Sequence, residues 1–157
     1  MITKDEFRQA LAHFPSGVTV VTTRDKAGRL HGITVSAFCS VSLEPPLVLV
    51  CIDKSTGSHP AFEFGGTFVV NVLRKDQARL SNHFASLIAD KFDRIEYRQT
   101  SDGVPVLDDA LVNLECRLVS AHEGGDHSIF VGEIQNATIK DGRPLIYFQG
   151  NYRSLKD

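Results

Sequence analysis

The stretch that decides the fold reads GITVSAFCSVSL over residues 32–43. Side chains of a β-strand alternate between its two faces. In this stretch the odd positions from Ile33 to Leu43 are apolar, whereas the even positions carry threonine and serine hydroxyls, with Phe38 as the exception. The pattern predicts one long strand with a core face and a face of small hydroxyl groups. Those hydroxyls either face solvent or line a binding site, and the alternation is compatible with both.

The flanking segments predict more strands joined by short turns. VTVVTT precedes the turn-forming RDKAGRLHG, which predicts a hairpin with the hydroxyl stretch. Pro45 and Pro46 mark the entry to a further strand, because proline cannot donate to a ladder. The apolar run from Leu47 to Ile52 predicts burial on both faces of that strand. Other strands are predicted over residues 67–73, 111–121, 127–139 and 144–148.

Helical periodicity is confined to short segments. Residues 1–14 place apolar side chains at helical spacing, and Pro15 ends the helix. Residues 76–87 repeat this spacing through Leu87, and residues 61–64 fit a helical turn.

Strands therefore dominate, and the sequence predicts a mainly β fold. About six or seven strands with few helices favour an antiparallel barrel with short helices at its rim. The βαβ rhythm of a doubly wound sheet is missing, as are the GxGxxG and P-loop motifs. We expect one domain over residues 1–157.

Composition narrows the class of protein. With 42% hydrophobic residues and a net charge of -2, the chain is typical of a globular protein, and no run approaches the ~20 apolar residues of a membrane span. The three cysteines are scattered without metal-ligand spacing, which predicts reduced thiols in a cytoplasmic protein. The N-terminus lacks the apolar core of a signal peptide, and no basic patch suggests nucleic acid as a partner.

Besides the hydroxyl stretch, three segments are candidates for chemistry. CIDKSTGSHP could surround an anion, EGGDHSIFVGEI places His127 at the start of a strand, and YFQGNYR clusters aromatic residues near a glycine. The first two segments are also compatible with solvated turns, and the aromatic residues of the third with a packed core or interface. No nucleophile elbow or paired metal-ligand motif is present, so an enzyme of this kind would rely on the chemistry of a cofactor.

Five segments of the chain carry a combined signal: FPSGVTVVTT, GITVSAFCSVSLEPPLVLV, LSNHFA, GDHSIFVGEI and PLIYFQGNYRSL. In combination they resemble the short-chain flavin reductases, the small components of two-component flavin-dependent monooxygenases, which have the FMN-binding split-barrel fold. Ser16 stands where threonine is usual in that family, His83 where a basic residue is commoner, and Gln149 and Asn151 where arginines are frequent.

The resemblance implies a flavin, FMN or FAD, along the hydroxyl stretch, with Ser36 near its phosphate. Backbone groups from Cys51 to Asp53 would pass the isoalloxazine ring. His127 would be the catalytic residue on the side where nicotinamide stacks. The implied flavin and nicotinamide contacts are Thr34, Val35, Ser36, Ala37, Cys51, Ile52, Asp53, Ser55, Ser58, Ser81, His83, Phe84, Lys91, Tyr152 and Arg153.

The activity implied is that of an NAD(P)H-dependent flavin reductase, which passes hydride to flavin and supplies reduced flavin to a separate monooxygenase. The resemblance also implies a homodimer with flavin near the subunit interface. Two alternatives stay open: a reductase that retains FMN and reduces a corrinoid or ferric complex, and a non-catalytic flavin-binding module. The residues distinguish neither FMN from FAD nor NADH from NADPH, and leave open whether the flavin stays bound.

Overall fold

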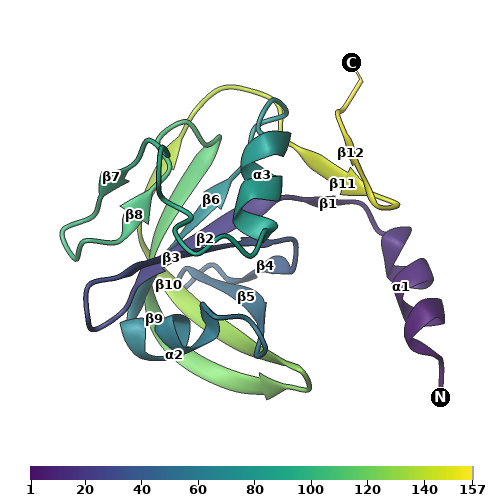
Figure 1. The fold of residues 1–157 in the computed structure, drawn as a ribbon, viewed down its shortest axis with the longest axis horizontal. Helices are drawn as coiled ribbons and strands as arrows, with labels where there is room; N and C mark the ends of the chain where they lie inside the picture. Colours follow the sequence, from purple (N-terminus) through teal and green to yellow (C-terminus); the bar gives the residue numbers. More distant parts are fainter. Residues whose placement is uncertain (157) are drawn as a thin grey trace.

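A seven-stranded antiparallel sheet in the order β3-β2-β6-β9-β10-β5-β4 forms the body of the protein (Figure 1). The computed structural model describes residues 1–156. Small helices flank the curved sheet, as the alternating strands and short turns predicted. The strands and helices are α1 (Lys4–Ala12), β1 (Ser16–Gly17), β2 (Thr19–Arg24), β3 (Leu30–Val35), β4 (Phe38–Ser42), β5 (Leu47–Asp53), α2 (His59–Gly65), β6 (Thr67–Val72), α3 (Ala78–Ala85), β7 (Arg98–Gln99), β8 (Pro105–Val106), β9 (Val112–Gly124), β10 (His127–Ile139), β11 (Ile146–Phe148) and β12 (Asn151–Arg153).

The hydroxyl stretch forms two strands, and the prediction of one long strand was wrong. β3 ends at Val35 and pairs with β2, whereas β4 begins at Phe38 and pairs with β5 at the other edge of the sheet. The predicted core face therefore holds for Val35, which is buried, but Val41 and Leu43 are 49% and 92% exposed. A bulge between Ser40 and Ser42 further interrupts the alternation.

The core lies inside the curved sheet. Val48, Val50 and Ile52 of β5 are buried there, together with Phe130 of β10. The alternate residues of β5, including Cys51, are only partly buried, so the prediction of burial on both faces was wrong. In this chain no described layer of residues fully covers the outer face of β5.

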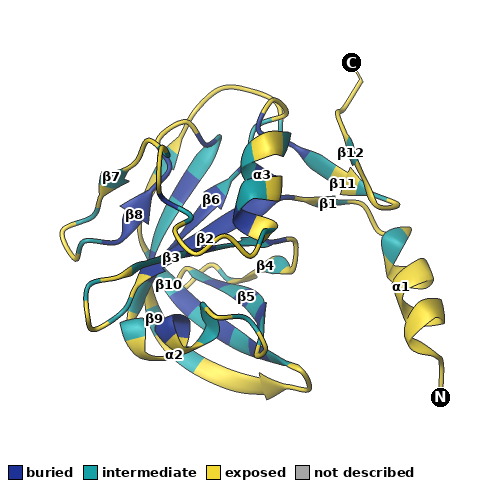
Figure 2. Ribbon diagram, in the orientation of Figure 1, coloured by how far each residue is buried: buried dark blue, intermediate teal, exposed yellow. Residues whose placement is uncertain are grey.

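The helices differ in how they pack. α1 has a capping box at Thr3 but no buried residue, and it stands apart from the body of the molecule (Figure 2). α3 buries Ser81 and Phe84 against β3. Leu87 lies beyond the end of α3 and is exposed, so its predicted place on the packed helix face was wrong. No helix within residues 1–156 is long and apolar enough to cross a membrane.

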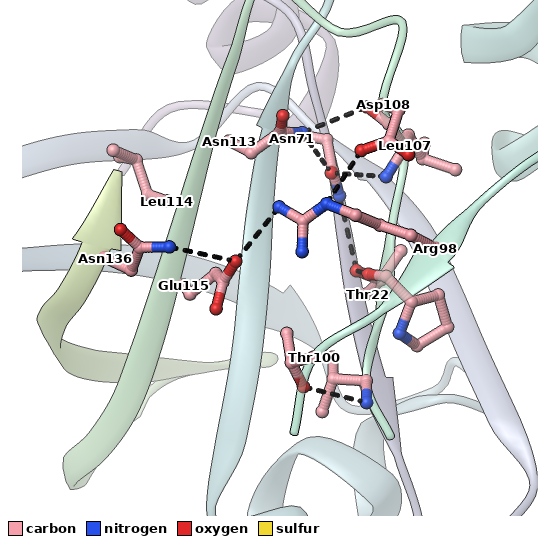
Figure 3. A network of polar contacts seen from close by, with 12 residues as sticks. Thr22, Asn71, Arg98, Thr100, Leu107, Asp108, Asn113, Leu114, Glu115 and Asn136 are labelled. Carbon is pink, nitrogen blue, oxygen red and sulfur yellow. Dashed lines mark hydrogen bonds and ion pairs between the residues drawn. The ribbon is translucent and has the colours of Figure 1, made fainter. Parts of the chain in front are cut away.

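A buried polar network joins β6 and β9 to the segment that follows β8 (Figure 3). Asn71 of β6 and Asn113 of β9 are paired neighbours, and both are buried. The Asn71 Oδ1 atom accepts hydrogen bonds from the backbone N–H of Leu107 (3.0 Å) and from the Asn113 amide (2.9 Å), which also donates to the Leu107 carbonyl (3.0 Å). These bonds hold the segment between β8 and β9 against the sheet and satisfy amides that would otherwise be costly to bury.

Candidate functional site

Two adjoining cavities lie along the edge strand β3. The segment from Cys51 to Gly57 runs beside β3 in the opposite direction. Near the end of β3 the Cys51 N–H donates to the Ala37 carbonyl (3.0 Å), and near its start Gly57 lines the same cavity as His31. α3 lies over β3 as a third wall (Figure 1). The cavities have volumes of about 410 and 320 Å³, and both are lined by Ala85 at the end of α3.

We name the larger one the Lys91 cavity, because Lys91 supplies its ammonium group. The Lys91 Nζ atom donates to the carbonyls of Phe84 (2.7 Å) and Gly32 (3.1 Å), which fixes it between α3 and β3. Burial lowers the pKa of Lys91. No carboxylate of residues 1–156 forms an ion pair with this half-buried ammonium group. Burying a cation without a counter-ion is unfavourable, so the cavity favours an anionic ligand.

The loop between β5 and α2 faces this ammonium group across the cavity. The Ser55 N–H donates to the Asp53 carboxylate (2.7 Å), and this bond, more than any other contact, holds the pKa of Asp53 below its usual range. The Thr56 hydroxyl donates to the Asp53 carbonyl (2.8 Å). Among the hydrogen bonds of the described chain, none uses the N–H of Gly57 or the N–H and hydroxyl of Ser58. These donors are available to an anion.

We name the smaller one the Tyr152 cavity. Its hydroxyls are linked: the Tyr152 hydroxyl donates to Asn82 Oδ1 (2.8 Å) and contacts Ser81 Oγ (2.8 Å), and the Thr34 hydroxyl donates to the Ser81 carbonyl (2.6 Å). This chain of bonds holds α3, β3 and β12 together. Ser36 is exposed in the same cavity, and its hydroxyl has no partner among the described residues.

The structure therefore gathers the predicted site residues into two groups. Ser55, Ser58 and Lys91 line the Lys91 cavity, whereas Thr34, Ser36, Ser81 and Tyr152 line the Tyr152 cavity. The groups are joined through β3 and Ala85. The hydroxyls of Ser40 and Ser42 lie on β4 and line neither cavity.

Two of the predicted contacts have structural roles in this chain. Phe84 has no exposed surface, and its ring packs so closely on Gly32 that a Cβ atom there would lie 2.6 Å from it. Phe84 therefore offers no surface to a ligand. His83 lines neither cavity, and its Nε2 atom hydrogen-bonds the Lys91 carbonyl (2.7 Å), so it positions Lys91.

His127 lies apart from both cavities. It is paired with Asp53 across β10 and β5, and alternation places it on the outer face of the sheet with Cys51 and Ile129. Its Nδ1 atom contacts the Asp126 carboxylate (2.7 Å), and this partner holds the pKa of Asp126 below its usual range. Seven further predicted site residues line neither cavity: Val35, Ala37, Cys51, Ile52, Asp53, His127 and Arg153.

The sequence reasoning missed two polar residues of the site. Asn82 accepts a hydrogen bond from the Tyr152 hydroxyl. Its place in LSNHFA, between the predicted contacts Ser81 and His83, was the available signal. Ser86 lines the Lys91 cavity and bonds to the His83 carbonyl (2.6 Å), but no motif marked it.

The comparisons with known proteins identify the class. The family described as "Flavin reductase like domain" matches residues 11–156. The chain therefore belongs to the flavin reductase-like family, and the family and the split-barrel fold implied by the resemblance are both confirmed.

Relatives carry several names. The chain is 42% identical over 149 residues to the actinorhodin polyketide dimerase of Streptomyces coelicolor. The match covers 94% of this chain and 84% of the relative. It is also 42% identical over 149 residues to the reductase component of a Rhodococcus opacus 4-nitrophenol 4-monooxygenase/4-nitrocatechol 2-monooxygenase, covering 95% and 80%. The solved NADH:FAD oxidoreductase of Streptomyces globisporus, in complex with NAD and FAD fragments, has a TM-score of 0.92 and 35% identity, covering 98% of this chain and 93% of that one.

Proposed function

We propose that this chain is an NAD(P)H-dependent flavin reductase whose flavin lies along β3, with its phosphate in the Lys91 cavity. The observation that carries the proposal is the half-buried Lys91 ammonium group, which has no carboxylate partner among the described residues and faces the free donors of Gly57 and Ser58. A phosphate ester supplies the missing negative charge and accepts those donors. Ser36 lines the other cavity, so we move the expected phosphate contact from Ser36 to Lys91.

The residues of the chain fit the rest of a flavin. A ribityl chain that follows β3 from the Lys91 cavity would meet Thr34 and Ser36, whose small polar groups suit a polyol. Backbone groups of Ala37 and Cys51, already in register with each other, flank the same edge and offer a surface for a planar ring. Burial raises the pKa of the Cys51 thiol, so it stays protonated beside the ligand.

In hydride transfer the main task of the chain is to position the two reacting rings. A bound flavin supplies the ring that accepts hydride from a nicotinamide. The chain has to hold two rings at near-attack distance, about 3–3.5 Å, and to exclude water from between them. We assign His127 to the nicotinamide side, because it lies on the outer face of the sheet and is paired with Asp53, two residues before Ser55 of the Lys91 cavity.

We also propose that the chain forms a homodimer. α1 exposes Phe7 and Leu11 and buries none of its residues, and Phe14, two residues after its end, is exposed as well. The outer face of the sheet, with Leu49 and Ile129, is only partly buried in one chain. Two such surfaces cover each other in a twofold assembly. The double variant Leu11→Asp, Phe14→Asp should shift the mass measured by light scattering to that of a monomer, whereas Ile139→Ala should not.

We further propose that the reduced flavin leaves the chain for a separate oxidising enzyme. The support is the relative named as the reductase component of a monooxygenase. One relative is named as a polyketide dimerase and not as a reductase component, so a second candidate stays open, in which flavin stays bound and another acceptor is reduced.

The test is steady-state NADH oxidation under air at increasing concentrations of free FMN. A diffusing flavin predicts a rate that rises with FMN and saturates. A rate indifferent to added FMN supports the second candidate instead. Binding of flavin without NADH or NADPH oxidation would contradict both and indicate a binding module.

A further inference from the structure

A third cavity adjoins the Lys91 cavity at the end away from Ser36. It has a volume of about 540 Å³, and we name it the Phe64 cavity. His31 and Gly57 line both cavities, so the space that holds the proposed phosphate continues past these two residues. The turn between β2 and β3 forms one side of the Phe64 cavity, and α2 forms the other.

Phe64 gives this cavity an aromatic surface. Its side chain is 58% exposed, although it lies on the same short helix as the buried Phe62. The Lys26 Nζ atom lies 5.7 Å from the centroid of the Phe64 ring. An exposed phenyl ring beside a cation is suited to stack a planar base that carries a phosphate.

The charged side chains that line the Phe64 cavity, Lys26 and Arg29 against Asp25, leave a positive surplus. The Asp25 carboxylate accepts hydrogen bonds from the backbone N–H groups of Ala27 and Arg29, from Arg29 Nε and from His31. The bond to His31 makes the largest contribution to keeping the pKa of Asp25 well below its usual range. Its charge is thereby engaged within the turn. The terminal nitrogens of Arg29 and the Lys26 ammonium group form no hydrogen bond to any residue of 1–156. Arg29 is ion-paired with Asp25 through Nε, but its terminal nitrogens and the Lys26 ammonium group remain available to an anion.

We propose, on the basis of the proposed function, that the Phe64 cavity binds the AMP half of FAD, with adenine against Phe64 and the second phosphate between Lys26 and Arg29. A flavin whose first phosphate lies by Lys91 directs its second phosphate past His31 and Gly57, into the adjoining cavity. The chain accordingly binds the dinucleotide FAD more tightly than the mononucleotide FMN.

Fluorescence titration with FAD and with FMN tests this without turnover. Phe64→Ala should weaken FAD binding about tenfold and change FMN binding less than twofold, because FMN has no base to stack. Lys26→Gln should weaken FAD binding about threefold, since an exposed cation contributes less. Phe64→Tyr retains the stacking surface and should retain the affinity for FAD, and Ile139→Ala, exposed elsewhere, should alter neither affinity.

The outcomes separate this inference from the proposed function. If wild-type chain binds FMN and FAD equally and Phe64→Ala changes neither affinity, the adenine site is overturned and the flavin reductase stands. An equal loss of both flavins in Phe64→Ala also overturns the site, because it reports damage to α2. If the wild-type chain binds neither flavin, the proposed function and this inference fail together.

Discussion

Lys91 offers the sharpest test of the flavin site. Lys91→Met removes the ammonium group and keeps a long apolar side chain of similar reach. FMN and riboflavin differ by the phosphate that we place beside this group. The substitution should therefore weaken FMN binding strongly and riboflavin binding hardly at all.

The size of the effect follows from the environment of the ammonium group. A hydrogen bond to a charged partner contributes about 1.5–3 kcal/mol. Lys91 is half-buried, so solvent screening favours the lower part of that range, about 1.5–2 kcal/mol. This corresponds to a loss of affinity for FMN of about 10–30-fold. The carbonyls of Gly32 and Phe84 lose a donor, but relief of the buried charge offsets part of that loss, so the free energy of unfolding should change by at most about 1 kcal/mol.

The assay is parallel fluorescence titration of FMN and riboflavin, with urea unfolding as the measure of stability. Lys75→Met is the matched control, since Lys75 is exposed and lines neither cavity. An equal loss of affinity for FMN and riboflavin would show that Lys91 acts only by holding α3 to β3. Unchanged affinity for FMN would refute the phosphate site.

Three further predictions address other parts of the molecule. His127→Ala should slow flavin reduction about tenfold in stopped-flow at saturating flavin while flavin affinity stays within twofold; an unchanged rate constant would remove His127 from the nicotinamide side. Asn71→Ala leaves the Leu107 N–H and an amide donor unpaired in the core, so urea unfolding should report a loss of about 2–4 kcal/mol, and a loss below 1 kcal/mol would contradict the network. Burial raises the pKa of Cys116 to about 12, so at pH 8 a disulfide reagent should modify Cys39 in the native protein and Cys116 only after denaturation; native reaction at Cys116 would count against the packing.

The strand content was predictable because alternation survives in most of the sequence. The long runs that became β9 and β10 each carry many alternating positions, and their short turn fixes antiparallel pairing. The division of the hydroxyl stretch had no such signal. Ser36 and Ala37 connect two strands, and neither is a proline or glycine. The apolar alternation continues in the sequence, although the chain passes there from one edge of the sheet to the other.

One missed strand did have a local signal. Gln149 and Gly150 both have positive φ, 49° and 74°, and they connect β11 to β12 as a two-residue turn. A glutamine before glycine is a weak version of the usual asparagine–glycine pair, so the segment was interpreted only as a cluster of aromatics.

The site was predictable in its members but not in its grouping. The resemblance implied loop and strand residues such as Ser58 and Thr34 as members of the site. A resemblance gives positions along the chain but no distances between side chains. Which hydroxyls are already bonded, as Thr34 is to Ser81, depends on where α3 packs. The structural role of Phe84 likewise depends on Gly32, which permits the ring to approach β3.

The open edge of β3 has a consequence for handling the protein. An edge strand presents backbone groups to which a strand of another molecule can add, and this is a common route to aggregation. Lys91 already occupies the Gly32 carbonyl on this edge, which is how many native sheets discourage such pairing. A ligand lying along the remainder of β3 completes the protection, so preparations stripped of flavin should precipitate sooner on concentration than those kept saturated with it.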